Sequence, residues 1–198
     1  MAKLHFKYGA MSSSKSNLLI NAAHNYEQSG RLHVATIKPS IDTKGDKWIV
    51  SRGGARREVD ILATPEAILG EELGLLMARK AFESLNCVLV DEAQFLQPTQ
   101  VDQLYEVAKA DDISVIAYGL RTDFQTKLFP GSQRLLELAD NIEKLPTMCG
   151  CGSQAEFNCR KVNGLYVFSG DQVAIDGQGA ITYDSLCGRC YAAEKGPS

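Results

Sequence analysis

The sequence lacks any long uninterrupted apolar run. None of its segments approaches the ~18 apolar residues that a membrane-spanning helix requires. The opening residues, Met1 to Gly9, contain no apolar core of a signal peptide. We therefore expect a cytoplasmic protein without a membrane partner, in which thiols stay reduced.

The chain also lacks an excess of positive charge, and it is poor in histidine. Its 21 Lys and Arg residues are outnumbered by 24 Asp and Glu residues, which gives a net charge of −3. This balance does not suggest a nucleic-acid-binding surface, and we expect no nucleic-acid partner. The three histidines, His5, His24 and His33, lie far in sequence from the cysteines. We expect them to be structural or surface residues rather than ligands or bases.

A serine-rich segment near the N-terminus has the pattern of a phosphate-binding loop. It lies between a β-prone stretch, residues 3–8, and a stretch from Lys15 with apolar residues at helical spacing. The segment consists of Gly9, Ala10, Met11, Ser12, Ser13, Ser14, Lys15 and Ser16. Such a strand, loop and helix present backbone N–H groups to phosphates. Lys15 would neutralise the β- and γ-phosphates of ATP, and Ser16 would bind Mg²⁺.

Ser14 departs from that pattern, which has glycine at this position. A Cβ atom narrows the approach of the backbone to a phosphate and disfavours positive φ. We therefore predict weaker ATP binding or a slightly shifted loop, but not loss of function. The simpler alternative is a serine-rich turn that binds nothing.

Two acidic residues, Asp91 and Glu92, follow the apolar run Cys87-Val88-Leu89-Val90. Such a run is typical of a parallel strand buried on both faces, and α/β sheets bind their ligands at the carboxyl ends of their strands. Asp91 fits the acid that holds Mg²⁺. Since adjacent strand residues point to opposite sides, Glu92 would be free to accept a proton from a hydroxyl or to orient a water. The alternative is a pair of surface acids.

The remaining pattern alternates strands with helices as far as Leu145. We expect strands over residues 32–37, 114–118 and 141–145, and a hairpin around Trp48 in the loop 40–60. We expect helices from residue 15 to about Gly30, from Pro65, from Pro98 with Asp102 closing a capping box, and over 132–139. The predicted fold class is α/β, a P-loop (RecA-like), mostly parallel sheet with helices on both faces. After Pro146, helical periodicity ends, and short β-prone pieces occupy residues 164–168, 173–175 and 181–183.

Four of the six cysteines form two close pairs, Cys149/Cys151 and Cys187/Cys190. In a reducing compartment, such pairs indicate metal ligands rather than disulfides. Four thiolates favour tetrahedral Zn²⁺ in a structural site with no open position. Cys87 is expected in the core, whereas Cys159 is either exposed and free or a misleading ligand candidate. We place a domain boundary near Leu145, with a nucleotide-binding domain at 1–145 and a zinc-ribbon-like β module at 146–198.

These motifs, in this order, resemble the type II thymidine kinases, the cytosolic and bacterial class with a zinc-bound lasso. The resemblance covers essentially the whole chain. It rests on the loop from Tyr8 to Ser16, on residues 88–96, on Tyr118-Gly119-Leu120-Arg121-Thr122-Asp123-Phe124, on residues 128–132 and on the cysteine pairs with Tyr183. It implies transfer of the ATP γ-phosphoryl group to the 5′-hydroxyl of thymidine, and of deoxyuridine as well, in nucleoside salvage.

The resemblance also implies roles for individual residues. Glu92 would be the general base, Asp91 would lie at the Mg²⁺, and Ala93 and Gln94 would complete the nucleotide site. Phe124 would stack near the thymine ring, with Tyr183 alongside. The loop Val173, Ala174, Ile175, Asp176 and Gly177 would read the base, with Asp176 where a glycine is usual. Arg52 resembles an arginine near the phosphates, although a solvated surface charge is an equally open reading. A homotetramer with feedback by dTTP is implied.

Two other functions stay open at this point. One is a nucleotide hydrolase of the RecA or helicase type, since Asp91-Glu92-Ala93-Gln94 resembles a helicase motif. The chain is short for the paired domains that such motors use. The other is a zinc-ribbon binding module that uses the nucleotide only as a switch.

Overall fold

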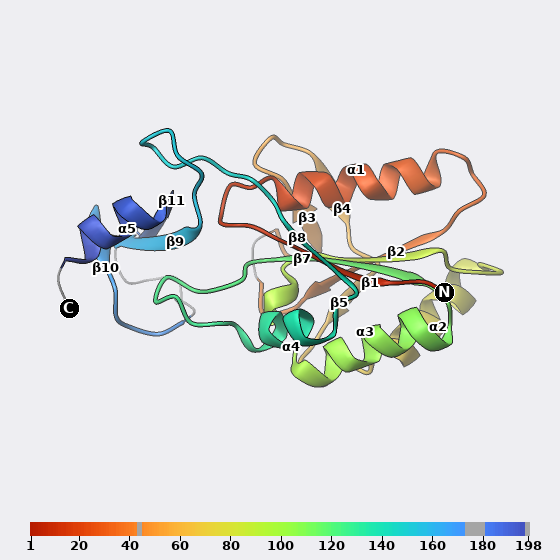
Figure 1. Ribbon diagram of the computed structural model, residues 1–198. Helices are drawn as coiled ribbons and strands as arrows, with labels where there is room; N and C mark the ends of the chain where they lie inside the picture. Colours follow the sequence, from red (N-terminus) through yellow and green to blue (C-terminus); the bar gives the residue numbers. More distant parts are fainter. Residues whose placement is uncertain (43–44, 173–180, 197–198) are drawn as a thin grey trace.

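The main body of the protein is a parallel sheet with helices on both faces (Figure 1). The computed structural model describes residues 1–42, 45–172 and 181–196. The strands lie in the order β5-β2-β6-β7-β1-β8, and every neighbouring pair is parallel. They are β1 (Leu4–Tyr8), β2 (Val34–Pro39), β5 (Ile61–Ala63), β6 (Cys87–Val90), β7 (Ser114–Gly119) and β8 (Asn141–Lys144). The predicted α/β class is confirmed.

Each face of this sheet has its own hydrophobic core. One face is covered by α1 (Lys15–Glu27), which buries Leu19 and Ala23 against Leu89 and Tyr118. The opposite face is covered by α2 (Leu69–Lys80), α3 (Pro98–Ala110) and α4 (Pro130–Leu138) (Figure 1). Because both faces are covered, β2 and β6 are buried along their whole length. Only β7 separates β1 from β6, so the carboxyl ends of these two strands lie close together at the same edge of the sheet.

α2 begins at a different residue from the one predicted, and α3 is capped by a different side chain. α2 starts at Leu69, not at Pro65, because Ile68 is still extended and Gln103 Oε1 accepts the first helical N–H at 2.7 Å. α3 starts at Pro98 as predicted, but Asp102 does not close its first turn. Gln100 Oε1 does so, by accepting the N–H of Gln97 at 3.1 Å.

The predicted hairpin around Trp48 is present. It pairs β3 (Trp48–Val50) with β4 (Arg56–Glu58) in antiparallel fashion. The Arg56 guanidinium lies 4.5 Å from the centre of the Trp48 ring, and Arg57 pairs with Glu27 of α1 at 2.6 Å. The first contact lies within the hairpin, and the second ties the hairpin to the last residue of α1.

The C-terminal part forms a second, smaller sheet beside the main body (Figure 1). Its strands are β9 (Phe157–Val162), β10 (Leu165–Val167) and β11 (Ile181–Leu186), in the antiparallel order β10-β9-β11, followed by α5 (Gly188–Lys195). β10 and β11 lie where short strands are expected, whereas β9 and α5 were missed. α5 buries only Tyr191, so it carries no apolar periodicity to detect. Residues 173–175 lie outside the described residues, and the boundary near Leu145 stays a prediction.

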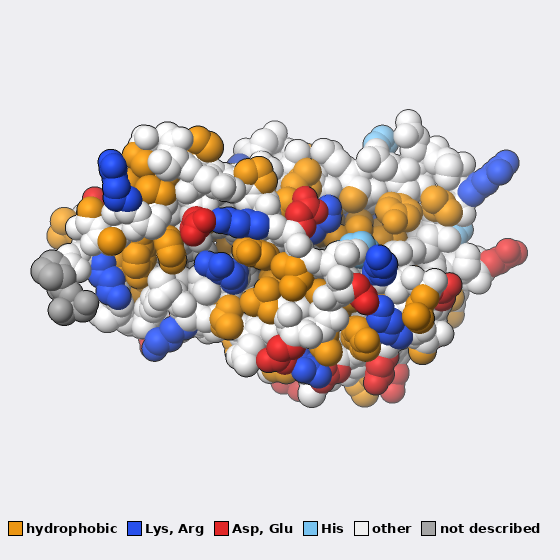
Figure 2. Space-filling model, viewed as in Figure 1, with side chains coloured by type: hydrophobic (Ala, Val, Ile, Leu, Met, Phe, Trp, Pro, Cys, Tyr) orange, Lys and Arg blue, Asp and Glu red, His pale blue; other side chains and the backbone are white. Residues whose placement is uncertain are grey.

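Charged side chains of both signs are scattered over the face of the molecule shown in Figure 2, rather than gathered by sign. Within the described residues, the helices are all too short or too polar to cross a lipid bilayer.

Candidate active site

The serine-rich loop connects β1 to α1, as the sequence predicts. Lys15 is only 8% exposed, and its ammonium group turns back over the loop. Its Nζ donates to the carbonyls of Gly9 and Ala10, both at 3.0 Å, and to Ser13 Oγ at 3.2 Å. A positive charge therefore lies inside the curve of the loop, beside the N-terminus of α1, where an anion is favoured.

The loop reaches its shape through two residues in the left-handed region. Ser12 has φ of 68°, and Ser14, which precedes the first residue of α1, has φ of 60°. Ser14 thus adopts the conformation for which glycine is usual, and its Cβ makes that conformation less favourable. Gly9 is favoured for a different reason, since a Cβ at this position would clash with the Ser13 side chain and lie 3.0 Å from the carbonyl oxygen of Leu145.

Asp91 and Glu92 diverge because the chain turns sharply after β6. The strand ends at Val90, and Glu92 has φ of 48°, so a turn separates the two side chains rather than the alternation of a strand. Asp91 is 3% exposed and accepts a hydrogen bond from Ser16 Oγ at 3.4 Å. Burial, and next the charge of Glu92, raise the pKa of Asp91 to about 7. A cation at this position would lower the free-energy cost of burying the ionised carboxylate.

The residues present fit Mg²⁺ at this point. The Ser16 hydroxyl and the Asp91 carboxylate are the hard oxygen donors that Mg²⁺ prefers, and neighbouring donors around this ion are about 3 Å apart. Their separation of 3.4 Å is close to that value. Ser16 and Asp91 could therefore hold the ion directly or through water.

A cavity of about 240 Å³ opens above the loop, and it brings most of the predicted nucleotide residues together. Glu92 faces it, and the Glu92 carboxylate also accepts a hydrogen bond from Gln94 Nε2 at 2.7 Å. The lining comprises Met11, Ser12, Ser13, Ser14, Lys15, Ser16, Asn17, Val50, Ser51, Arg52, Gly53, Glu92 and Leu120. Gly9, Ala10, Asp91, Ala93 and Gln94 lie behind this lining rather than on it.

The turn of the β3–β4 hairpin closes one side of the cavity. Arg52 reaches across it and donates to the Ser12 hydroxyl, so it contacts the loop rather than only solvent. Ser51, which the sequence analysis did not single out, is 6% exposed, and its Oγ has no hydrogen-bond partner among the described residues. A buried hydroxyl of this kind is what an oxygen of a bound ligand would satisfy.

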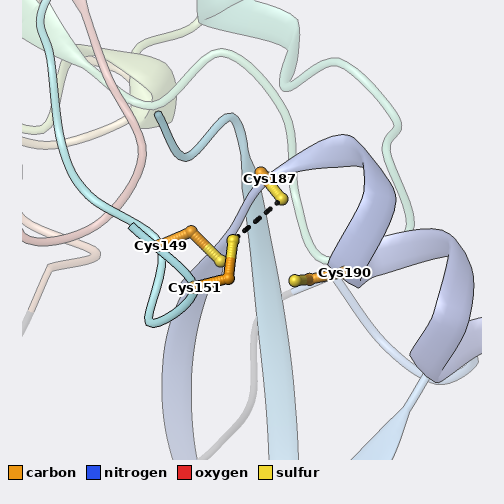
Figure 3. A group of neighbouring side chains, drawn as sticks. All are labelled: Cys149, Cys151, Cys187 and Cys190. Atoms are coloured by element: carbon orange, nitrogen blue, oxygen red, sulfur yellow. Dashed lines mark hydrogen bonds between the residues drawn. The ribbon is translucent and has the colours of Figure 1, made fainter. Parts of the chain in front are cut away.

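The four predicted ligand cysteines converge in the small sheet (Figure 3). Cys149 and Cys151 come from the loop before β9, whereas Cys187 and Cys190 lie at the start of α5. Their four sulfur atoms lie within 4.8 Å of one another, and those of Cys151 and Cys187 are 3.6 Å apart. Thiolates around one tetrahedral Zn²⁺ stand about 3.8 Å apart, whereas a disulfide requires about 2 Å. The cluster fits a metal ion such as zinc.

The pKa of one thiol in the cluster agrees with that fit, whereas the pKa of another is shifted in the opposite direction. The backbone and side chain of Ser153 lower the pKa of Cys151 to about 6, which favours the thiolate that metals bind. Hydrogen bonds with the neighbouring thiols of Cys151 and Cys187 raise the pKa of Cys190 to about 12. The other two cysteines lie outside the cluster. Cys87 is buried in the core as predicted, and Cys159, for which exposure was one open alternative, is 1% exposed.

The residues predicted to bind a nucleoside are described only in part. Val173, Ala174, Ile175, Asp176 and Gly177 lie outside the described residues. Phe124 is 2% exposed, and one face of its ring is covered by the guanidinium of Arg160, 3.8 Å from the ring centre. Arg160 Nε also donates to the hydroxyl of Tyr183 at 3.0 Å. Phe124 and Tyr183 are therefore brought together by a residue that the sequence analysis missed.

Besides Phe124 and Tyr183, Arg160 contacts a third segment of the chain. Its Nη1 and Nη2 donate to the carbonyls of Asp171 and Gln172, at 2.8 and 3.0 Å. Arg160 is only 5% exposed, which is unusual for arginine. No local sequence signal identifies it, because its partners lie on three separate segments of the chain.

Comparison with known proteins gives a consistent result. Residues 2–191 match the family model described as thymidine kinase. The chain is 42% identical over 193 residues to a thymidine kinase of Chromobacterium violaceum, covering 96% of this chain and 98% of that protein. It is also 42% identical to thymidine kinases of Ruegeria pomeroyi and Enterobacteria phage T4, in each case over 94% of this chain and 92% and 94% of those proteins.

Proposed function

This chain belongs to the thymidine kinase family and is an ATP-dependent kinase of thymidine, and we propose that Glu92 is the base that accepts the proton of the thymidine 5′-hydroxyl. The observation that carries this proposal is the position of Glu92, which lines the same cavity as Lys15 and the phosphate loop. A general base must come within hydrogen-bond reach of the proton that it takes. Asp91, by contrast, is buried behind the lining and faces Ser16.

The remaining polar groups of the cavity orient the phosphates and stabilise their charge. Phosphoryl transfer depends mainly on alignment and on stabilisation of charge on the transferred group. Lys15 binds the β- and γ-phosphates, the N–H groups of the loop orient them, and Arg52 approaches them from the hairpin. Ser16 and Asp91 would hold a Mg²⁺ ion, which would neutralise charge on the phosphates. The buried hydroxyl of Ser51 supports the presence of a ligand on the hairpin side.

The small sheet contributes to the proposed binding site for the nucleoside. Cys149, Cys151, Cys187 and Cys190 would hold Zn²⁺ in a structural role, because four protein ligands leave no open position. Phe124 and Tyr183, joined through Arg160, contact the thymine base, and Val173, Ala174, Ile175, Asp176 and Gly177 read it, as the family resemblance implies. Deoxyuridine is accepted as well. The protein is a cytoplasmic homotetramer, and dTTP inhibits it by feedback.

The test measures transfer of labelled γ-phosphate from ATP to a panel of nucleosides. The wild type is expected to phosphorylate thymidine and deoxyuridine. Glu92→Gln is expected to keep ATP binding and its melting temperature, while kcat falls by about 10²–10⁴-fold, the usual contribution of a general base. Glu106→Gln, at an exposed position on α3, is the matched control and should retain normal turnover.

Two results would contradict the proposal. Near-normal kcat in Glu92→Gln would exclude Glu92 as the base. Hydrolysis of ATP that is indifferent to nucleoside would favour a nucleotide hydrolase. Light scattering, and thymidine kinetics with added dTTP, test the oligomer and the feedback separately.

A further inference from the structure

The backbone of Met11, at the outer part of the phosphate loop, is held by two side chains of the small sheet. The N–H of Met11 donates to Asn158 Oδ1 at 2.7 Å, and the carbonyl of Met11 accepts from Ser185 Oγ at 2.6 Å. These partners lie 147 and 174 residues away along the chain. Both polar groups of one loop residue are therefore satisfied by the small sheet.

The two side chains are placed for this by the pairing of their strands. Ser185 on β11 lies directly opposite Asn158 on β9, and residues opposite each other in an antiparallel pair project from the same face. The sheet thus presents an acceptor and a donor side by side, which match the N–H and carbonyl of Met11. Asn158 is 4% exposed, and its amide nitrogen also donates to the carbonyl of Thr122 at 3.0 Å, which fixes its orientation.

These contacts act at a point where the loop needs support. Met11 lines the cavity and directly precedes Ser12, which has φ of 68°. A non-glycine residue in that region costs energy, and surrounding contacts must hold it there. The N–H groups of the loop can point at a phosphate only while the loop keeps this path.

We propose that Asn158 and Ser185 are positioning residues for the phosphate-binding loop, so that affinity for the triphosphate of ATP depends on the small sheet. This inference rests on the proposed function only in taking ATP as the ligand of the loop. Neither residue lines the cavity above the loop, and both act through Met11. The small sheet therefore serves both substrates: it contributes to the nucleoside side and it shapes the loop that binds ATP.

The experiment separates positioning of the loop from general support of the fold. Binding of Mg²⁺ with a non-hydrolysable ATP analogue is measured by calorimetry without nucleoside, and the KM of thymidine is measured at saturating ATP. The variants are Ser185→Ala and Asn158→Ala. Thr182→Ala, at an exposed position on the same strand as Ser185, is the matched control.

Ser185→Ala is expected to weaken binding of the ATP analogue about fivefold, the effect of losing one hydrogen bond. Asn158→Ala, which loses two, is expected to weaken it more, while the KM of thymidine stays within twofold in both. Thr182→Ala should leave both quantities unchanged. Since Asn158 is buried, its variant could fail to fold, in which case Ser185→Ala alone decides.

The inference is overturned if Ser185→Ala binds the ATP analogue as the wild type does, or if both substrates weaken by the same factor. The proposed function fails in a distinguishable way, namely if the wild type binds the ATP analogue but phosphorylates no nucleoside.

Discussion

The phosphate loop and the cysteine cluster differ in how much buried apolar core surrounds them. The loop leaves a strand of the main sheet, where β2 and β6 are buried throughout and each face has its own core. In the small sheet, β10 and β11 are mostly half-exposed, and the clustered cysteines Cys149 and Cys187 are themselves part of the core. Burial of apolar surface stabilises the first region, whereas we expect the second to depend on a metal ion held by the cysteine cluster.

The difference shows how each region contributes to the site. The main sheet can hold charges at the end of a strand, since its rigid core tolerates a buried Lys15 and Asp91. The small sheet has little apolar surface to bury, and it meets the main body through hydrogen bonds from Asn158 and Ser185. This comparison is tested by substitutions that affect either the main sheet or the small sheet but not both.

Among the substitutions that compare the two regions, the largest effect is expected in the phosphate loop, from Lys15→Met. It removes the positive charge that faces the phosphates, and kcat should fall by about 10²–10³-fold, as for loss of one group that stabilises developing charge. Steady-state kinetics measure this, and Lys7→Met, a change of the same kind on β1, is the control. Turnover within tenfold of the wild type would argue against a phosphate at this position.

The next effect is expected at the metal cluster, from Cys187→Ser. Loss of one ligand should abolish stoichiometric zinc and unfold the small sheet, because its own core is too small to hold it. Metal analysis and hydrogen exchange measure this: amides of β9 and β11 should lose protection while those of β6 and β7 keep theirs. Cys159→Ala, outside the cluster, should retain zinc. Loss of protection throughout the chain would show that the two regions do not fold separately.

A smaller effect, confined to the binding of the nucleoside, is expected from Arg160→Lys. Lysine cannot stack a planar group on Phe124 while bonding Tyr183 and two carbonyls, so the thymidine KM should rise about tenfold. The KM of ATP should change less than twofold. Lys161→Met, at the next residue of β9, is the control. An equal rise in both constants would mean that Arg160 supports the fold rather than the nucleoside site.

The smallest effect is expected from Ser14→Gly. Glycine would relieve the left-handed strain, roughly 1 kcal/mol, but would add freedom to the unfolded chain of similar size. Stability should therefore change little, and the ATP KM should fall a few-fold, since the backbone could approach the phosphates more closely. Ser29→Gly, in the exposed turn after α1, is the control. An unchanged KM would show that this position tolerates a side chain freely.

The sequence by itself determined the elements that depend on neighbouring residues. The alternation of strands and helices follows from local apolar patterns, and it correctly predicted β1, β6 and β7 with the helices between them. The phosphate loop and the cysteine pairs were recognisable because their chemistry requires fixed spacings along the chain. β9 and α5 were missed because they carry little apolar periodicity: β9 buries the polar residues Asn158 and Arg160, and α5 buries only Tyr191.

Only the tertiary structure decided which distant residues meet. Arg160 joins Phe124 to Tyr183, and Asn158 with Ser185 holds Met11, across separations that leave no local pattern. The divergence of Asp91 and Glu92 likewise comes from a turn at positive φ, not from the strand alternation that the sequence suggests. The physical reason is that local propensity depends on near neighbours, whereas a buried polar contact depends on the packing of whole sheets.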